Sequence, residues 1–353
     1  MQALPIGKIS HLSLAQCISP VQSNDIYPCS FQLVNKELQV PQNLSLTKAV
    51  ISLKIEAPQK TNLDADNLLE LVVFDTLTFS QLNALLTYSQ LQVQAINAMN
   101  DRNSEVSLRF NVTSDNILES RQLLADFALT NKIEAALMYD APKLATAGLL
   151  VMDMDSTTIE IECIDEIAEL AGVGAEVSAV TELAMQGQLD FAQSLYQRVS
   201  TLKDAPESIL ADVAKDIPLM PGLEGLIKLL KQHNWRIAIA SGGFTYFADH
   251  LLNLLDLDDA FANTLEIIDG KLTGKVLGDV VDAQAKADVL GILSEKYQIP
   301  HKQTVAMGDG ANDLVMMGSA YLGVAFHAKP IVLAKADTTI NHTGLDCLLH
   351  WLA

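Results

Sequence analysis

The chain has 353 residues, of which 49% are hydrophobic and 19% are charged. This length favours two domains, and the apolar content excludes a wholly disordered chain, which could not bury enough surface to fold. With 43 acidic and 23 basic residues the net charge is −20, which disfavours nucleic acids and anionic membranes as partners. A small anionic substrate stays compatible, because a metal ion and a few basic groups can invert the local field.

Targeting signals and disulfide patterns are not evident in the sequence. No apolar run approaches the roughly 18 residues that a membrane helix needs, and the first residues do not form a secretory signal. The four cysteines are scattered, without a CxxC pair. These features are typical of a reduced protein, so we expect a cytoplasmic location.

The N-terminal part of the chain divides into an irregular segment and a regular one. Prolines interrupt residues 1–67, which predict only short β-like pieces at 29–34 and 49–55. From 68 to 140 the hydrophobic spacing alternates between strand and helix periods, and residues 141–147 predict a linker. The elements expected within 68–140 are strands at 69–74, 91–96, 106–112 and 135–139, helices at 80–88 and 116–131, and a turn at 100–103. This βαββαβ order is a split βαβ unit.

From residue 148 onward the predicted strands are continuous apolar runs separated by helices. The clearest strands are 148–152, 236–240 and 304–307. Strands of this kind are typical of a parallel sheet that helices cover on both faces. We therefore expect an α/β fold here, with ligands bound beyond the carboxyl ends of the strands.

Each of these strands is followed by residues that can carry chemistry. The first is followed by Asp-Met-Asp-Ser-Thr at 153–157, the second by Ser-Gly-Gly-Phe at 241–244, and the third by Gly-Asp-Gly-Ala-Asn-Asp at 308–313. Lys286 lies early in a helix predicted over 283–293. Because the carboxyl ends of parallel strands share one edge of a sheet, these groups can converge.

Convergence would place the carboxylates of Asp153, Asp155 and Asp309 in one site. Unpaired carboxylates repel one another, which makes their convergence unfavourable. A bound Mg²⁺ would offset this repulsion, because its preferred ligands are carboxylate and phosphate oxygens. The glycines after Ser241 let backbone amides approach an anion, and Lys286 adds a positive charge. Such a site suits phosphoryl transfer. One carboxylate can attack phosphorus, and its neighbour two residues on can carry protons.

Each motif also has a plainer interpretation on its own. Asp-x-Asp at a strand end is often a turn or a helix cap, Ser-Gly-Gly is usually a turn, and a lone lysine on a helix is usually solvated. The run at 308–313 is similar to part of a calcium loop but lacks the final Glu of that loop. Finding all four in order, each at or beside a predicted strand end, favours function over structural accident.

Together the four motifs resemble those of the haloacid dehalogenase superfamily, over about residues 148–340. Within it, the runs at 153–166, 220–223 and 241–245 are most similar to the phosphoserine phosphatase family. The resemblance implies a Rossmann-like phosphatase domain over 148–353 with a helical cap at about 162–220. It also implies Mg²⁺-dependent hydrolysis of O-phospho-L-serine through an aspartyl-phosphate, the last step of L-serine biosynthesis.

The resemblance further implies a role for each matching residue. Asp153 is similar to the nucleophile of this family, and Asp155 to the general acid/base, which also offers its backbone carbonyl to the metal. The implied set is catalytic Asp153, Asp155 and Lys286; metal-binding Asp153, Asp155 and Asp309, supported by Asp313; and substrate-binding Glu162, Arg198, Ser241, Gly242 and Asn312.

The assignment of Glu162 and Arg198 has a physical check. Phosphoserine carries an ammonium and a carboxylate beside its phosphate, and an acid and an arginine complement those two groups. Both residues lie in a stretch that predicts helices at 162–171, 176–185, 191–202 and 207–217, which would act as a lid over the substrate. Without the resemblance, Arg198 is more simply an exposed helix residue. We expect Cys163 to be a buried small side chain rather than a catalytic thiol.

The βαββαβ region at 68–140 resembles an ACT domain, a regulatory module that binds amino acids. Its turn at 75–80 has no glycine where such domains carry a glycine-rich docking turn. We therefore hypothesise that this domain makes a homodimer rather than binding serine. Two other functions stay open for the whole chain. They are a phosphatase of another small phosphomonoester and a serine-sensing regulatory protein with a decayed catalytic domain.

Overall fold

The computed structural model describes residues 14, 32–34, 37–39, 69–185 and 188–353. Contacts divide the chain into two compact units, which are described separately. The first unit contains Met1–Ala141, Asp337–Thr343 and Cys347–Ala353, and the second contains Pro142–Ala336 and Gly344–Asp346. Of the β-like pieces predicted within 1–67, only 32–34 lies among the described residues. It forms β1 (Gln32–Val34), which pairs antiparallel with β2 (Glu37–Gln39).

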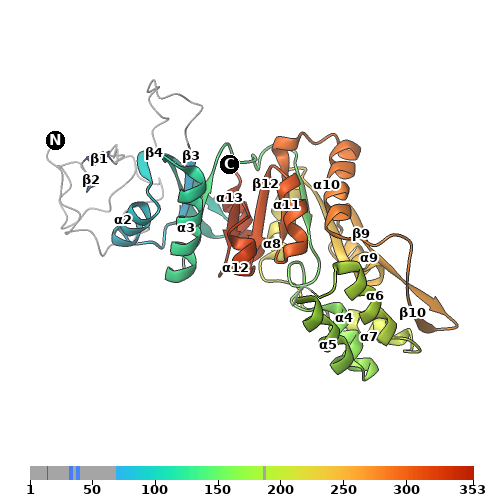
Figure 1. Ribbon diagram of the computed structural model, residues 1–353. Helices are drawn as coiled ribbons and strands as arrows, with labels where there is room; N and C mark the ends of the chain where they lie inside the picture. The colour runs from blue at the N-terminus through green and yellow to red at the C-terminus, as the bar shows by residue number, and fades with distance from the viewer. Residues whose placement is uncertain (1–13, 15–31, 35–36, 40–68, 186–187) are drawn as a thin grey trace. The chain divides into compact units, whose positions relative to one another are not determined.

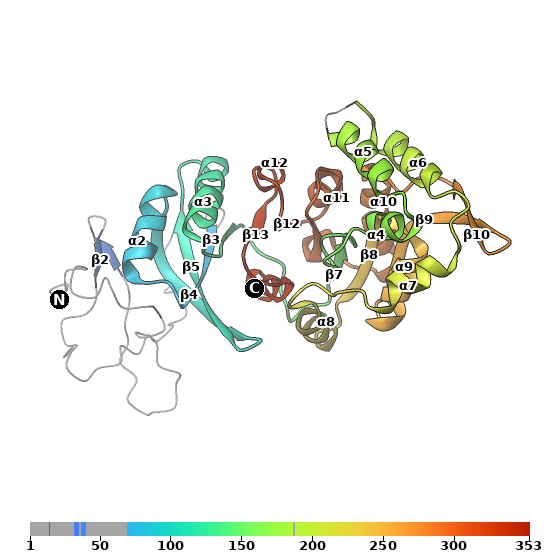
Figure 2. The ribbon, with the colours of Figure 1, turned by 90° about the horizontal axis from the view of Figure 1, so that it is seen from below.

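The first unit has the βαββαβ order that the hydrophobic spacing predicted. Its four-stranded sheet has the order β4-β5-β3-β6, all antiparallel, and α2 and α3 lie together on one face (Figure 2). The elements are β3 (Leu69–Phe74), α2 (Phe79–Tyr88), β4 (Gln92–Arg102), β5 (Glu105–Thr113), α3 (Ile117–Asn131) and β6 (Ala135–Met138). Alternate strand residues such as Leu71 and Val73 pack with Leu85 and Leu124 of the helices, and Val72, which points to the opposite face, is also buried.

The last residues of the chain also belong to the first unit, although we expected 148–353 to be a single domain. Arg109 explains this grouping. Its buried guanidinium pairs with Glu70 at 2.7 Å and donates to the carbonyls of Leu352 at 2.7 Å and Trp351 at 3.1 Å. Next to it, the ring of His350 lies 4.7 Å from that of Phe74. The segments involved carry β13 (Thr338–Ile340) and α13 (Leu348–Trp351), and the 3₁₀ turn η5 (Leu345–Cys347) precedes α13.

The second unit is built on a mainly parallel sheet, as predicted. Its strands follow the order β10-β9-β8-β7-β11-β12, and only β9 and β10 pair antiparallel. The strands are β7 (Leu149–Met152), β8 (Arg236–Phe244), β9 (Asp259–Ile268), β10 (Lys271–Leu277), β11 (Thr304–Gly308) and β12 (Leu322–Phe326).

Helices cover both faces of this sheet, with α10 and α11 on one face and α8 and α9 on the other (Figure 2). Leu149 and Val151 pack against Leu290 and Met316, and the intervening Leu150 points to the opposite face and is also buried. The helical elements are α8 (Leu223–Gln232), α9 (Thr245–Leu254), α10 (Ala283–Tyr297), η3 (His301–Gln303), η4 (Ala311–Asp313), α11 (Leu314–Ser319) and α12 (Pro330–Leu333).

Four further helices lie between β7 and β8 and form the predicted cap (Figure 1). They are α4 (Cys163–Ala171), α5 (Gly174–Met185), α6 (Phe191–Thr201) and α7 (Ser208–Lys215). Each matches a predicted helix to within two residues at either end. A capping box starts α6, in which Asp190 accepts from the Gln193 amide at 2.8 Å. The α6 helix supplies one wall of the cavity described below.

Three details differ from the sequence predictions. The turn expected at 100–103 lies instead at Asn103 and Ser104, which both have positive φ, because β4 continues to Arg102. The β8 strand continues through 241–244 with a register shift after Ala240, so the Ser-Gly-Gly run ends this strand rather than following it. The antiparallel β9–β10 hairpin has no counterpart in the prediction, although the Asp269-Gly270 pair at its turn, in which both residues have positive φ, is a local hairpin signal.

Candidate active site

The carboxyl ends of β8, β7 and β11, three adjacent strands, bring the predicted motifs together. Asp153 follows β7, and its backbone amide donates to the Met307 carbonyl on β11 at 3.0 Å. The chain then turns tightly, because the Thr158 hydroxyl donates to the Asp153 carbonyl at 2.6 Å and the Thr158 amide to the Met154 carbonyl at 2.8 Å. This turn fixes the directions of the two acidic side chains at 153 and 155.

Lys286 lies at the centre of a buried charge cluster. Its ammonium is 2.8 Å from Asp153 Oδ2 and 2.7 Å from Asp313 Oδ1, and the Lys286 side chain is fully buried. Burial alone would lower the pKa of Lys286, but the two carboxylates outweigh burial and raise that pKa above its ordinary value. Lys286 is therefore a fixed positive charge beside Asp153.

The carboxylates at this end of the sheet form a set suited to a divalent cation. Asp153, Asp309 and Asp313 each offer one oxygen, and these oxygens lie within 4.8 Å of one another. Three carboxylates against the single ammonium of Lys286 leave two negative charges uncompensated. Burial first, and then the charge of Asp153, raise the pKa of Asp309 to about 6, which shows how unfavourable the charged set is by itself. The residues present thus fit Mg²⁺, whose preferred ligands are oxygens.

Asp155 lies outside that carboxylate set and beside the cap. Its Oδ1 accepts from the Cys163 amide at 3.3 Å. Burial, then the charges of Glu162 and Asp153, raise the pKa of Asp155 to about 8. A carboxyl of this kind can hold a proton near neutral pH, as a general acid must. Cys163 itself is buried, and burial raises its thiol pKa above the ordinary value, as expected for a packing residue.

Polar groups from β8 and from the turn after β11 line the same cavity, which has a volume of about 220 Å³. The Ser241 hydroxyl accepts from the Gly243 amide at 2.9 Å, and the Gly242 carbonyl accepts from Asn263 at 2.8 Å. Asn312 completes this side of the wall. Hydroxyl, amide and backbone donors around a small opening are what a phosphate group requires.

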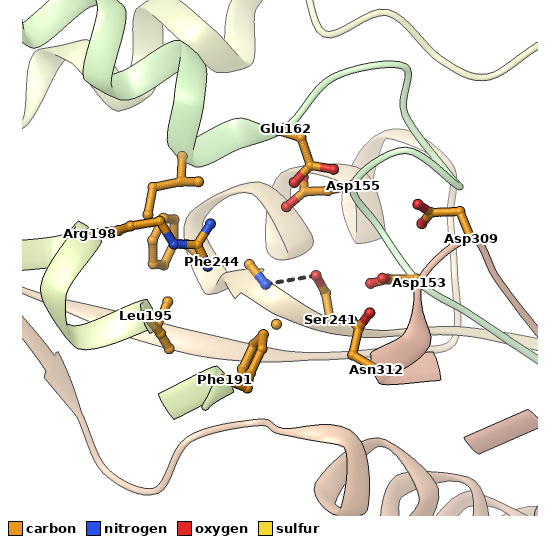
Figure 3. A pocket seen from close by; sticks show the side chains of 13 residues that line it. Asp153, Asp155, Glu162, Phe191, Leu195, Arg198, Ser241, Phe244, Asp309 and Asn312 are labelled. Carbon is orange, nitrogen blue, oxygen red and sulfur yellow. Dashed lines mark hydrogen bonds between the residues drawn. The ribbon is translucent and has the colours of Figure 1, made fainter. Parts of the chain in front are cut away.

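The cap supplies the opposite wall of the cavity. Figure 3 shows Arg198 and Leu195 on one side and Asp153, Asp309 and Asn312 on the other, with Ser241 between them. The Nε atom of Arg198 is buried and has no hydrogen-bond partner among the described residues, and burial lowers the Arg198 pKa. A buried donor atom without a partner is costly, so this side of the cavity suits an anionic group that can accept from the guanidinium.

Glu162 faces the cavity from the start of α4. Its Oε1 accepts from the Ser156 hydroxyl at 2.7 Å, and burial raises the pKa of its carboxyl. Eight of the predicted site residues therefore line one cavity: Asp153, Asp155, Glu162, Arg198, Ser241, Gly242, Asp309 and Asn312. The other two, Lys286 and Asp313, join the site through their contacts with each other and with Asp153.

Apolar side chains complete the cavity, and the sequence predictions did not include them. Phe191 and Leu195 come from α6, Ile164 from α4, and Phe244 from the end of β8. Phe191, Leu195 and Arg198 are spaced i, i+4, i+7, so they share one face of α6. Once Arg198 is assigned to the site, this helical spacing would have been sufficient to find the other two.

Comparisons with known proteins agree with this geometry. Residues 148–320 match the family model of the haloacid dehalogenase-like hydrolases. A phosphoserine phosphatase of Haemophilus influenzae is 58% identical over 236 residues, which cover 66% of this chain and 75% of the relative. The chain belongs to the haloacid dehalogenase-like hydrolase family. It is therefore a hydrolase of the superfamily that the four motifs indicated, and the predicted α/β fold of its second unit is confirmed.

Two further matches come from Vibrio cholerae. This hydrolase is 60% identical to a phosphoserine phosphatase of that organism over 221 residues, which cover 62% of this chain and 67% of the relative. A crystal structure of a probable phosphoserine phosphatase from Vibrio cholerae has a TM-score of 0.69 and 48% identity, covering 83% of this chain and 88% of that one. Separately, none of the helices that the structure describes has the length and apolar character that crossing a bilayer requires.

Proposed function

We propose that this hydrolase cleaves O-phospho-L-serine to L-serine and phosphate in a Mg²⁺-dependent reaction. The observation that carries the proposal is one cavity with two chemically different ends. Asp153, Ser241 and Asn312 line the end suited to a phosphate, and Glu162 and Arg198 the end suited to an amino acid. The names of the relatives at 58% and 60% identity support the same substrate.

At the phosphate end, we propose that Asp153 is the nucleophile. One of its oxygens attacks phosphorus, and the bond from phosphorus to the serine oxygen breaks, which leaves an aspartyl-phosphate. Lys286, 2.8 Å from Asp153, holds that carboxylate in place and offsets negative charge as the reaction proceeds. Ser241 and the amides near Gly242 would bind the phosphate oxygens in both steps.

Asp155 would move the protons of both steps. It donates a proton to the serine oxygen as that group leaves, and then accepts one from the water that attacks phosphorus. This second attack releases phosphate and restores the Asp153 carboxylate. The backbone hydrogen bond from Cys163 to Asp155 Oδ1 fixes the direction of the carboxyl throughout.

The metal would be held by Asp153, by Asp309 and by the backbone carbonyl of Asp155, with Asp313 supporting them. When bound, Mg²⁺ neutralises charge on the phosphate oxygens and so favours attack by an anionic carboxylate. The support from this chain is the charge balance, since three carboxylates and one ammonium leave two negative charges.

At the other end of the cavity, we propose that Glu162 binds the ammonium and Arg198 the carboxylate of the substrate. Glu162 is exposed and Arg198 is half-buried, so both charges are accessible to a substrate that enters the cavity. The Arg198 Nε has no hydrogen-bond partner among the described residues, so an anion that accepts from it would satisfy a buried donor. Phe191 and Leu195 would exclude water from the reacting groups.

A substrate panel tests this proposal. Phosphate release is measured with L-phosphoserine, L-phosphothreonine, phenyl phosphate and a sugar phosphate, each with Mg²⁺ and with EDTA. We expect L-phosphoserine to have the highest kcat/KM and release to require the metal. Preference for another ester would assign the chemistry to a different phosphomonoester and contradict the roles of Glu162 and Arg198. Absence of release from every ester would favour the regulatory function instead.

We further propose that the first unit, whose ACT-like identity stays a prediction, pairs two copies of the chain. The support is its four-stranded sheet with helices on one face, a shape that can associate through sheet edges or helices. Sedimentation of the full chain tests this, with a mass of two chains expected and a mass of one chain contradicting it. A place in L-serine biosynthesis follows from the proposed product, and the cytoplasmic location stays a prediction.

A further inference from the structure

Ser156 has a backbone conformation that serine rarely adopts. Its φ is +56°, in the left-handed region that favours glycine and, among other residues, Asn and Asp. It lies directly after Asp155, in the turn that follows β7. Strained residues persist where the surrounding contacts hold them, and they are concentrated at functional sites. The contacts of Ser156 therefore indicate its function.

The left-handed turn directs the Ser156 hydroxyl toward the cap. Ser156 Oγ donates to Glu162 Oε1 at 2.7 Å, and the Ser156 amide donates to the Ile161 carbonyl at 3.3 Å. The short loop is thus closed by one backbone and one side-chain hydrogen bond. A further hydrogen bond holds the second half of this loop, because the Glu160 amide donates to the Pro218 carbonyl at 3.0 Å.

Glu162 needs such a partner because its own helix does not hold it. Glu162 is the N-cap residue of α4, yet its side chain makes no capping hydrogen bond. Its carboxylate faces the cavity instead, where the charges of Asp153 and Asp155 repel it. Among the described residues, the Ser156 hydroxyl is the hydrogen-bond donor to this carboxylate that the structure shows.

We propose that Ser156 is a positioning residue that determines specificity for an amino-bearing substrate. Its hydroxyl holds one oxygen of Glu162, which leaves the other oxygen directed to the substrate ammonium. Because Ser156 adjoins Asp155, this bond sets the distance between the reacting centre and the ammonium-binding carboxylate. The inference rests on the proposed function of Glu162 and adds the residue that makes Glu162 selective.

Two substitutions separate the hydroxyl from the backbone strain. Ser156→Gly removes the hydroxyl and relieves the positive φ, whereas Ser156→Ala removes the hydroxyl and keeps the strain. Ser200→Ala is the matched control, because Ser200 is an exposed cap serine whose hydroxyl donates to the Gln197 carbonyl. Each variant is assayed with L-phosphoserine and with its analogue that lacks the amino group, 3-phosphonooxypropanoate.

The decisive readout is the ratio of kcat/KM for L-phosphoserine to kcat/KM for the analogue. We expect this ratio to fall about 10-fold in both Ser156 variants, mainly through a higher KM for L-phosphoserine, since a hydrogen bond to a charged group is lost. Ser200→Ala should keep the wild-type ratio. A merely structural role would lower both activities together, so an unchanged ratio in Ser156→Gly would overturn the inference.

The wild-type arm of the experiment tests the proposed function independently. A wild-type enzyme that prefers L-phosphoserine over the analogue supports the role of Glu162, whatever the variants do. A wild-type enzyme without that preference would refute the proposed function itself. Failure of the Ser156 inference and failure of the proposed function therefore give different results.

Discussion

Gly308, at the end of β11, gives the sharpest prediction about the charge cluster. A Cβ atom added there would lie 2.3 Å from Asp313 Cγ and 2.5 Å from Asp313 Cβ, whereas non-bonded carbons prefer about 3.5–4.0 Å. Asp313 cannot move away freely. It is fully buried, and its carboxylate accepts from Lys286 at 2.7 Å and from the Gly310 amide at 3.0 Å.

The magnitude of the Gly308→Ala effect follows from these contacts. Overpacking a rigid site costs about 1–3 kcal/mol. Displacing Asp313 also weakens a buried ion pair, whose loss costs about 3–5 kcal/mol when one partner is removed outright. Lys286 keeps Asp153 as a partner, so we expect part of that second cost and a total of about 2–4 kcal/mol. Activity should fall as well, because Asp309 adjoins the substitution.

Urea unfolding and steady-state kinetics measure the two consequences. The control is Gly291→Ala in α10, where an added Cβ meets no atom within 4 Å. Alanine is the better helix former there, so this variant should be more stable than wild type by up to about 1 kcal/mol. A Gly308→Ala enzyme within about 0.5 kcal/mol of the wild-type stability would refute the packing argument.

Three further predictions concern the cavity wall, a buried histidine and the segment before β7. In Gly242→Ala the added methyl would lie 2.5 Å from Phe191 Cζ. The Phe191 ring is half-buried and can move, so we expect little change in the free energy of unfolding. Its movement would alter the cavity wall, and we expect kcat/KM to fall about 10-fold in kinetic assays. Burial, then the charge of Arg102, lower the pKa of His350 to about 4. The folded state therefore favours neutral His350, and between pH 6.5 and 4 the wild type should lose about 3 kcal/mol of stability relative to His350→Gln in unfolding titrations. Gln303→Ala should lower the free energy of unfolding in urea by about 1–3 kcal/mol. The Gln303 side-chain oxygen accepts from the Lys143 amide, and its side-chain nitrogen donates to the carbonyls of Lys143 and Thr146.

Each of these three has an outcome that would contradict it. Wild-type kcat/KM in Gly242→Ala would show that the Phe191 ring does not shape the cavity. For His350, the slope of stability against pH should differ between the wild type and His350→Gln, and an equal slope in the two proteins would assign the pH dependence to other groups. Wild-type stability of Gln303→Ala would mean that water replaces the lost bonds.

The convergence of the site could be predicted because it follows from general rules of parallel sheets. Continuous apolar runs place β7, β8 and β11 in a buried sheet, and the shared edge at their carboxyl ends brings Asp153, Ser241 and Asp309 together. Local sequence is sufficient for this step. The roles of Glu162 and Arg198 needed the resemblance to a family, since a helix pattern does not say which face meets a cavity.

The parts that escaped prediction differ in kind. The β9–β10 hairpin has a local signal in its Asp269-Gly270 turn that the prediction did not use. Its contact with the cap, where the Leu272 carbonyl accepts from the Asp204 amide at 2.9 Å, is distant in sequence. The C-terminal segment joins the first unit through Arg109, whose buried guanidinium binds its carbonyls. Neither contact leaves a periodic signal in the sequence, because each depends on one or a few specific bonds.

The central claim is that Asp153 attacks the phosphorus of L-phosphoserine, and one comparison tests it most directly. Phosphate release from L-phosphoserine is measured for the wild-type enzyme and for Asp153→Asn, with folding verified by urea unfolding. We predict Mg²⁺-dependent release by the wild type and a loss of at least about 1000-fold in kcat for the variant. Release by a folded Asp153→Asn enzyme at close to the wild-type rate would contradict the claim.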